Sequence, residues 1–192
     1  ILYDDKAMEL VIRNHFAVSI GKYFAFPLEI QRRDIFRMLV VNREGGFYMD
    51  ADICCKKPLN PFLSYSLILA EEKTIGPSEM QQPHHRYRLR IANYMFASIP
   101  GHPFISAFTE AALNNGRVPV LCENDVLETT GPGLLTNFYH EQKQHYNDIF
   151  LLPNPSLHCV KRCCSQPSCH FGDYAMHLHE GSWRWGNKTM SK

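Results

Sequence analysis

Two carboxylates one residue apart end the segment Gly45-Gly46-Phe47-Tyr48-Met49-Asp50-Ala51-Asp52. The glycines predict the end of a helix, and the apolar residues after them predict a strand over 47–53. Residues i and i+2 of a strand point to the same side. Asp50 and Asp52 are therefore expected to converge at the carboxyl end of this strand, the edge where open α/β sheets bind ligands. Paired carboxylates there suit a hard divalent cation that also binds the phosphate oxygens of a substrate. The alternative interpretation of the two aspartates is a polar loop after a strand.

Composition narrows the class of protein. The chain has 192 residues, 45% of them hydrophobic and 20% charged, which is ordinary for one globular α/β domain. The formal net charge is +1, so the sequence lacks the basic excess of a nucleic-acid partner and we expect none. No apolar run approaches the roughly 20 residues of a membrane-spanning helix. The opening Ile1-Leu2-Tyr3 is typical of the end of a strand, so we expect a fragment that lacks its first strand.

Hydrophobic spacing predicts alternating helices and strands. Helices are expected over 5–18, 32–44, 103–114 and 134–146, with a break at Gly21. Strands are expected over 47–53, 66–70 and 149–152, and 91–98 is either a strand or a short helix. The part after 152 is predicted to be irregular. Helices that alternate with strands indicate an α/β layered domain.

The helix before the Asp pair carries two charged residues of its own. Asp34 and Arg37 are three positions apart and are therefore neighbours on one helix face. That face differs from the apolar stripe of Ile35 and Leu39. A solvated ion pair worth about 0–1 kcal/mol is one interpretation. The other is that this carboxylate and guanidinium hold sugar hydroxyls beside a metal-bound diphosphate, because the helix runs directly into the Asp pair.

These motifs together resemble a known family. Arg33-Asp34-Ile35-Phe36-Arg37 followed by the Gly45–Asp52 segment is similar to the glycosyltransferase family whose sugar-binding region contains an Asp-x-Asp motif, although that family usually has Ser at the position of Arg33. The family includes initiating and sphingolipid mannosyltransferases and, more remotely, the clostridial glucosylating toxins. Further segments of this chain are similar to later segments of the family, in the same order: Asn93, Pro100-Gly101-His102-Pro103, Thr130-Gly131-Pro132, and His177 with Gly181-Ser182-Trp183.

The resemblance implies a GT-A type, Rossmann-like nucleotide-sugar-binding domain over residues 1–192. It implies a metal-dependent, retaining transferase that uses Mn²⁺ or Mg²⁺. The donor would be a UDP- or GDP-hexose, and the acceptor a glycan, lipid or protein. A Golgi or other secretory membrane is the expected location if the full-length chain has an N-terminal anchor.

The resemblance also implies roles for individual residues. The catalytic set would be Asp34 and Arg37 at the donor sugar and Asp50 at ribose and sugar hydroxyls. Asp52 and His177 would ligate the metal. Tyr48 would lie near the ribose, Asn93 would line the sugar pocket, and Ser182 and Trp183 would close over the diphosphate with His177.

Several of these residues have simpler interpretations. Asn93 could be a satisfied core amide, His102 a helix cap, and Thr130-Gly131-Pro132 a turn fixed by its Gly-Pro pair. No residue stands out as a protein nucleophile. The alternative function is a catalytically degenerate nucleotide-sugar-binding protein.

Cysteines form the main departure from the family pattern. Cys159, Cys163, Cys164 and Cys169 lie between His158 and His170, in an expected insertion at 158–170. Their spacing matches no common zinc signature, so disulfides, a zinc site and unpaired thiols all remain open, and a cysteine-rich interaction module is a third functional class. Cys54 and Cys55 are expected to be buried and inert.

Overall fold

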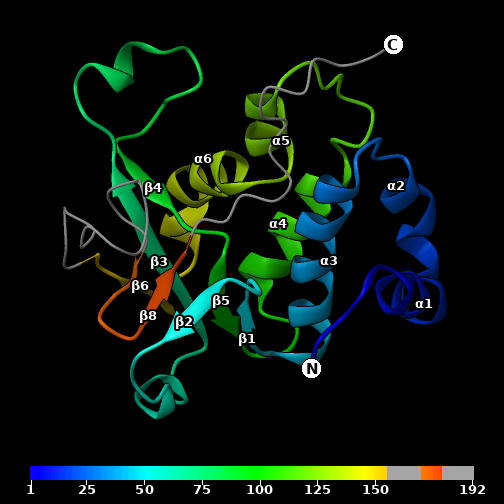
Figure 1. The fold of residues 1–192 in the computed structure, drawn as a ribbon, viewed down its shortest axis with the longest axis horizontal. Helices are drawn as coiled ribbons and strands as arrows, with labels where there is room; N and C mark the ends of the chain where they lie inside the picture. The colour runs from blue at the N-terminus through cyan, green and yellow to red at the C-terminus, as the bar shows by residue number, and fades with distance from the viewer. Residues whose placement is uncertain (155–169, 179–192) are drawn as a thin grey trace.

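The computed structural model describes residues 1–154 and 170–178, which form helices and strands in layers (Figure 1). The helices are α1 (Asp5–His15), α2 (Ile20–Phe24), α3 (Glu29–Glu44), α4 (Pro103–Leu113), α5 (Glu123–Thr129) and α6 (Pro132–Gln142). The strands are β1 (Gly46–Met49), β2 (Ile53–Cys55), β3 (Leu67–Thr74), β4 (Leu89–Ile91), β5 (Met95–Ser98), β6 (Ile149–Leu152), β7 (His170–Phe171) and β8 (Ala175–His177). The predicted α/β class is confirmed. None of the helices in this part of the chain has the length and hydrophobicity of a membrane span.

The larger sheet is organised around β3. The first half of β3 pairs in parallel with β6 and, at Leu67 and Ile68, antiparallel with β5. The second half pairs antiparallel with β4, and β1 adds to β5 in the same antiparallel sense. A smaller antiparallel sheet has the order β2-β8-β7. Within the described ranges the larger sheet is thus mixed, so the expectation of a ligand edge formed by parallel strands does not apply to β1.

Both faces of the larger sheet are covered by other elements. Neighbouring side chains of a strand point to opposite faces. Leu67 and Leu69 pack in the hydrophobic cluster shared with α3, α4 and α6, whereas Ile68 and Ala70 pack in the cluster that contains Phe62 and the smaller sheet. A strand that is buried on both faces has a continuous apolar sequence. The strand predicted over 66–70 is confirmed, and it extends to Thr74.

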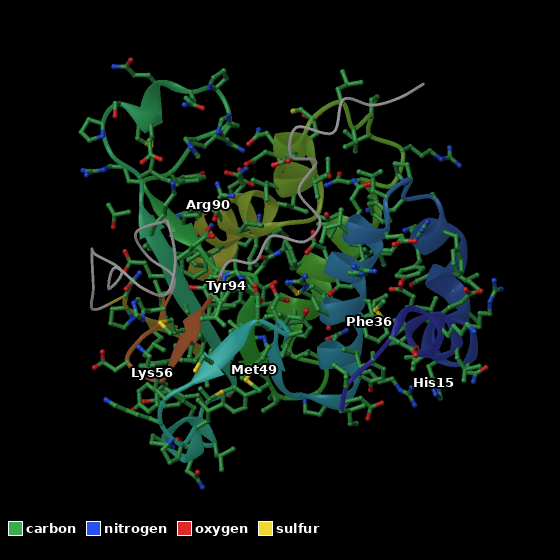
Figure 2. All side chains as sticks on the ribbon, in the orientation of Figure 1. His15, Phe36, Met49, Lys56, Arg90 and Tyr94 are labelled. Carbon is green, nitrogen blue, oxygen red and sulfur yellow. The ribbon has the colours of Figure 1, made fainter. Side chains whose placement is uncertain are left out.

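Helix α3 is buried around most of its circumference. It lies between α4 on one side and the α1–α2 segment on the other (Figure 1). Phe36, labelled in Figure 2, contacts the N-terminal segment, with its ring centre 5.1 Å from that of Tyr3. The helix begins at Glu29, earlier than the expected start at 32. Its buried residues include polar as well as apolar ones: Gln31, Asp34, Ile35, Phe36, Arg37, Met38, Leu39 and Val41.

The N-terminal helix differs from the prediction. The expected helix over 5–18 ends at His15, a short 3₁₀ turn follows at Ala17–Ser19, and α2 then includes Gly21, which is not a break. The backbone leaves the helical conformation at Phe16, with φ −127° and ψ 42°. Phe16 packs against the larger hydrophobic cluster, so tertiary packing turns the chain earlier than the local pattern indicates.

The strand before and through the Asp pair is also interrupted. The single strand predicted over 47–53 is divided into β1, which ends at Met49, and β2, which begins at Ile53. The backbone N–H of Ile53 donates to the carbonyl oxygen of Asp50 at 3.1 Å, which closes a turn over Asp50–Asp52. The two carboxylates therefore converge through a turn rather than through strand alternation.

Other boundaries shift for similar reasons. The segment 91–98 contributes to two strands, β4 and β5, because residues 92–94 cross from one to the other. The expected helix over 134–146 is α6 followed by a 3₁₀ turn at Lys143–His145, and further 3₁₀ turns occupy Asn60–Phe62 and Glu79–Gln81. Helix α5 was not predicted. The expectation of an irregular C-terminal part is wrong for β7 and β8. These two strands pair with each other, and β8 also pairs with β2, a long-range contact that leaves no local pattern in the sequence.

The junction between α3 and β1 requires glycine. Gly45 has φ +70°, and its N–H donates to the carbonyl oxygen of Val41 at 2.8 Å. A Cβ at Gly45 would lie 2.7 Å from Cδ of Pro100. The next residue, Gly101, donates its N–H to the carbonyl oxygen of Asn42 at 2.6 Å. The Pro-Gly segment thus fixes where α3 ends and where β1 starts.

His102 caps the helix that follows. Its Nδ1 accepts the backbone N–H of Phe104 at 3.2 Å at the start of α4, and its Nε2 lies 3.2 Å from Oδ2 of Asp148. The interpretation of His102 as a helix cap is confirmed.

We expect Gly45→Ala to lower the free energy of unfolding by about 1–3 kcal/mol, because alanine is strained at positive φ and meets Pro100. Gly21→Ala is the matched control. A Cβ added at Gly21 would have no atom within 4 Å, and alanine favours a helix, so this variant should be neutral or slightly stabilising. Urea denaturation measures both. Equal losses in the two variants would contradict the assignment of Gly21 to α2.

Candidate active site

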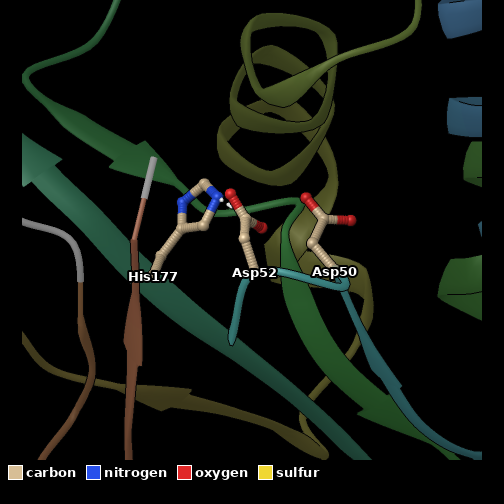
Figure 3. Close-up of side chains that lie close together, drawn as sticks. All are labelled: Asp50, Asp52 and His177. Carbon is tan, nitrogen blue, oxygen red and sulfur yellow. Dashed lines mark ion pairs between the residues drawn. The ribbon is translucent and has the colours of Figure 1, made fainter. Parts of the chain in front are cut away.

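Three possible metal ligands converge where β1, β2 and β8 meet (Figure 3). Asp50 follows β1 and Asp52 precedes β2, while His177 is the last residue of β8. The backbone N–H of Asp50 donates to the carbonyl oxygen of Tyr94 at 2.9 Å, and the carbonyl oxygen of Asp52 accepts the N–H of Leu178 at 3.0 Å. These hydrogen bonds tie the turn to both sheets and bring a histidine from the C-terminal part to the carboxylates.

The side chains of this group are close together. One ligand atom from each of Asp50, Asp52 and His177 lies within 4.8 Å of the other two. His177 Nε2 is 3.2 Å from Oδ1 of Asp52, and the imidazole packs against the ring of Tyr94, with centroids 4.4 Å apart. The structure therefore places the two residues expected to ligate the metal, Asp52 and His177, side by side.

The donor set fits a divalent cation. Carboxylate oxygens suit Mg²⁺ and Mn²⁺, and an imidazole nitrogen is a better ligand for a transition metal than for Mg²⁺. The side chains of Asp50, Asp52 and His177 are 24%, 19% and 13% exposed. They can thus be reached from outside, as a site must be that takes its remaining ligands from phosphate oxygens or water.

Asp34 and Arg37 form an ion pair inside the protein. Arg37 Nη2 lies 3.0 Å from Oδ1 of Asp34, and the side chains are 6% and 5% exposed. The interpretation of a solvated ion pair is wrong, because the elements around α3 cover this face of the helix as well as the apolar stripe.

Arg37 joins α3 to the turn that carries the carboxylate pair. Its Nη1 is 3.1 Å from Oδ1 of Asp50 and donates to the carbonyl oxygen of Asn93 at 2.9 Å. The guanidinium lies over the ring of Tyr48, 4.7 Å from its centre. The Tyr48 hydroxyl donates to the same oxygen of Asp50 at 2.6 Å. Arg37 and Tyr48 therefore hold the Asp50 carboxylate from two directions.

Asp34 collects donors from two other segments. Its Oδ1 accepts from the side-chain amide of Asn93 at 3.1 Å, and its Oδ2 accepts from the hydroxyl of Thr130 at 2.9 Å. Asn93 is thus a buried and bonded amide that also lies in the cluster. The sequence assigns Thr130 only to a turn, because nothing in its local pattern reveals a contact with α3.

Burial and neighbouring charge shift the pKa values in this cluster. Burial raises the pKa of Asp34 to about 6, although Arg37 and the hydrogen bond from Thr130 oppose this effect. Burial alone would lower the pKa of Arg37, but Asp50, Tyr48 and Asp34 outweigh it and raise the pKa, so the guanidinium stays charged. Burial raises the pKa of Tyr48, and its hydroxyl therefore remains a donor to Asp50.

Two predicted substrate-binding residues, Ser182 and Trp183, lie outside the described residues. The same holds for most of the expected cysteine-rich insertion at 158–170, including Cys159, Cys163, Cys164 and Cys169. The roles suggested for these residues stay predictions.

Cys54 and Cys55 are exposed, so the expectation that they are buried is wrong. They lie on β2, which pairs with β8 at one edge of the smaller sheet. The thiol of Cys55 lies 3.7 Å from the sulfur of Met49.

The comparison with protein families agrees with this geometry. The family described as a glycosyltransferase sugar-binding region containing a DXD motif matches residues 4–69. This range includes Asp34, Arg37, Tyr48, Asp50 and Asp52. The resemblance predicted from the sequence motifs is confirmed.

Individual relatives are named mannosyltransferases or synthases of mannosylated lipids. Inositol phosphoceramide mannosyltransferase 1 of Schizosaccharomyces pombe is 32% identical over 106 residues, which cover 55% of this chain and 29% of that protein. Mannosyl phosphorylinositol ceramide synthase CSH1 of Saccharomyces cerevisiae is 21% identical over 202 residues, which cover 100% and 46%. An initiation-specific alpha-1,6-mannosyltransferase of S. pombe is 25% identical over 224 residues, which cover 96% and 55%. The chain is therefore similar to enzymes, and it spans about half or less of the length of these relatives.

A solved structure, the PaToxG glycosyltransferase, is similar with a TM-score of 0.44 and 22% sequence identity. The match covers 73% of this chain and 41% of that one.

Arg37→Lys should lower the free energy of unfolding by about 2–4 kcal/mol, because an ammonium cannot bridge Asp34 and Asp50 at once and leaves a buried carboxylate without its partner. Arg33→Lys on the exposed side of the same helix is the control. Arg33 pairs with Asp5 near the surface, so Arg33→Lys should lower the free energy of unfolding by less than about 1 kcal/mol. Urea denaturation distinguishes the two, and similar small losses would show that the buried pair is not structurally important.

The raised pKa of Asp34 predicts a pH dependence of stability. A carboxyl with a folded-state pKa near 6 and an unfolded value near 3.8 contributes stability that is fully present below 3.8 and is lost as the pH rises through 6. The free energy of unfolding of the wild type relative to Asp34→Asn should therefore fall by about 2–3 kcal/mol between pH 4 and pH 7. Denaturation at both pH values, with Glu9→Gln as a surface control, measures the difference. A free energy of unfolding that rises with pH in the wild type relative to Asp34→Asn would contradict the raised pKa.

Proposed function

We propose that this chain carries the donor-binding region of a metal-dependent, retaining glycosyltransferase. The enzyme would move a hexose from a nucleoside-diphosphate sugar to a glycan, lipid or protein. The observation that carries the proposal is the convergence of Asp50, Asp52 and His177 beside the buried Asp34–Arg37 pair. The family match over residues 4–69 includes four of these five residues.

The proposed metal is Mn²⁺, with Mg²⁺ as the second candidate. Asp52 and His177 would hold it, and Asp50 lies close enough to join them. A divalent cation bound here would stabilise negative charge on the leaving diphosphate as a Lewis acid.

The residues around the metal site would orient the donor. Arg37 and Tyr48 fix the Asp50 carboxylate, so one of its oxygens is held while the other can accept sugar or ribose hydroxyls. Asp34 is almost fully buried and accepts from Arg37, Asn93 and Thr130. Its main contribution would be to position these three groups, with little surface left for direct contact with the sugar. Such preorganised polar groups need no rearrangement when charge develops in the reaction.

The names of the relatives suggest the first substrates to test. Mannose is the proposed hexose, because the similar proteins are named mannosyltransferases. A mannosylated lipid or glycan is the proposed product class, on the same ground. A GT-A type fold and a Golgi or other secretory location complete the proposal and follow from the resemblance to the family. The alternative, a catalytically degenerate nucleotide-sugar-binding protein that would keep the donor site without turnover, is not favoured, because the similar proteins are named transferases and synthases.

Incubating the protein with Mn²⁺ and a panel of UDP- and GDP-hexoses, and measuring the released nucleoside diphosphate, tests the proposal. We expect release with one donor, and at least a 100-fold lower rate for Asp52→Asn or with EDTA, in line with about 3 kcal/mol of lost charge stabilisation. Binding of Mn²⁺, followed by its paramagnetic resonance signal, should weaken in the same variant.

Asp173→Asn is the matched control, since Asp173 is an exposed carboxylate in the turn between β7 and β8 that lies 3.9 Å from Lys57. It should keep both the wild-type rate and Mn²⁺ binding. Donor binding without turnover for every donor and acceptor would favour the degenerate protein, and full activity of Asp52→Asn in EDTA would rule out the metal site.

A further inference from the structure

Tyr94 lies beside the candidate metal site, at the point where the two sheets meet. It belongs to the segment that crosses from β4 to β5, where Figure 2 labels it. Its side chain is 2% exposed and packs in the hydrophobic cluster that also contains Phe171 and Ala175 of the smaller sheet. The residue lies outside the family match at 4–69, and the sequence motifs give it no role.

Tyr94 contacts residues on both sides of the metal-ligand group. Its carbonyl oxygen accepts the backbone N–H of Asp50 at 2.9 Å. Its ring lies against the imidazole of His177, with ring centres 4.4 Å apart and an angle of 31° between the planes. Its hydroxyl donates to the carbonyl oxygen of His170 at 2.9 Å, on the strand β7 that pairs with β8. One buried residue therefore connects the turn after β1 to the strand that carries the histidine.

The ring contact depends on the side chain, whereas the contact with Asp50 does not. Any residue at position 94 offers a carbonyl oxygen to the N–H of Asp50. The backbone of His177 is fixed by the pairing of β8 with β2, but its imidazole can rotate about the two side-chain torsions. The Tyr94 ring covers one face of the imidazole and restricts this rotation, while Nε2 lies 3.2 Å from Oδ1 of Asp52.

The orientation of this imidazole affects which metal the site prefers. The carboxylates of Asp50 and Asp52 supply oxygen ligands, which suit both Mg²⁺ and Mn²⁺. An imidazole nitrogen favours a transition metal over Mg²⁺. Residues that orient a metal-ligating histidine without touching the metal typically change metal affinity by about 10–100-fold when they are replaced.

We propose that Tyr94 is a positioning residue that holds His177 in the metal site and thereby determines its preference for Mn²⁺ over Mg²⁺. The inference rests on the proposed function, because it takes Asp52 and His177 as the metal ligands. The flat face of the Tyr94 ring makes the decisive contact, since it packs on the plane of the imidazole. The hydroxyl has a separate role, which is to attach Tyr94 to β7.

The test measures metal binding and needs no donor sugar. Mn²⁺ is titrated into the protein and followed by its paramagnetic resonance signal, and the affinity for Mg²⁺ is measured by competition for the bound Mn²⁺. Tyr94→Leu should weaken Mn²⁺ binding by about tenfold and Mg²⁺ binding by less than about twofold. The ratio of the two affinities should therefore fall, whereas a general loss of structure would weaken the binding of both ions alike.

Tyr94→Phe separates the ring from the hydroxyl. This variant keeps the contact with His177 and loses the hydrogen bond to His170. It should therefore keep the wild-type ratio of affinities while its melting temperature falls. Tyr94→Met, which also lacks a flat ring, should behave as Tyr94→Leu and replaces it if the leucine variant does not fold.

Tyr174→Leu is the matched control. Tyr174 lies in the turn between β7 and β8 and packs against the same hydrophobic cluster, with its ring centre 4.5 Å from that of Phe62. Its replacement should lower the melting temperature and leave both metal affinities unchanged.

A double-mutant cycle with His177→Ala tests whether Tyr94 acts through the histidine. His177→Ala should itself lower the ratio of the two affinities by about tenfold or more, because the nitrogen ligand is lost. Adding Tyr94→Leu to His177→Ala should then change neither affinity further, since two substitutions that act through one contact are not additive.

The outcomes separate the two proposals. The inference is wrong if folded Tyr94→Leu and Tyr94→Met keep the wild-type ratio, or if the losses of Tyr94→Leu and His177→Ala add, while the transferase function would stand in both cases. It is also wrong if His177→Ala keeps the ratio. A wild type that shows the expected metal preference but releases no nucleoside diphosphate from any donor would overturn the proposed function and leave the inference standing. A wild type that binds no Mn²⁺ would overturn both.

Discussion

The buried ion pair between Asp34 and Arg37 connects the segments from which the candidate active site is made. Asp34 bonds Asn93 in the β4–β5 connection and Thr130 in the turn before α6, and Arg37 reaches Asp50 after β1. Three stretches of chain therefore meet at two side chains of one helix. Movement of α3 relative to the sheet would break contacts to all of them at once, so the position of the Asp50 carboxylate depends on the packing of α3.

This pair is difficult to explain as a source of stability alone. Removing two charges from water costs several kcal/mol per ion, and their attraction offsets that cost only with good geometry and further hydrogen bonds. Those conditions are largely met, since Asp34 accepts from three donors and Arg37 also contacts Asp50 and the Tyr48 ring. Burial nevertheless raises the pKa of Asp34, against the opposing effects of Arg37 and of the hydrogen bonds from Thr130 and Asn93.

The sequence predicts the elements of this fold better than their boundaries and contacts. The Gly45-Gly46 break, the buried strand at 67–70 and the helix from Pro103 follow from local patterns and are present. The burial of Asp34 and Arg37 could not be predicted, because helix periodicity describes one apolar face and α3 is covered on several. The contact of Thr130 with Asp34 could not be predicted either, because it joins residues that are far apart in the sequence.

His177 illustrates how a site residue can be predicted for one reason and positioned for another. The resemblance to the family assigns it, but the local sequence gives no strand there, and only the pairing of β8 with β2 brings it to Asp52. That pairing depends on the turn over Asp50–Asp52, which separates β1 from β2 and directs β2 into the smaller sheet. The same turn thus presents the two carboxylates and starts the strand that recruits the histidine. The candidate metal site therefore depends on the smaller sheet, and substitutions that disrupt the pairing of β2 with β8 should also move His177 away from Asp52.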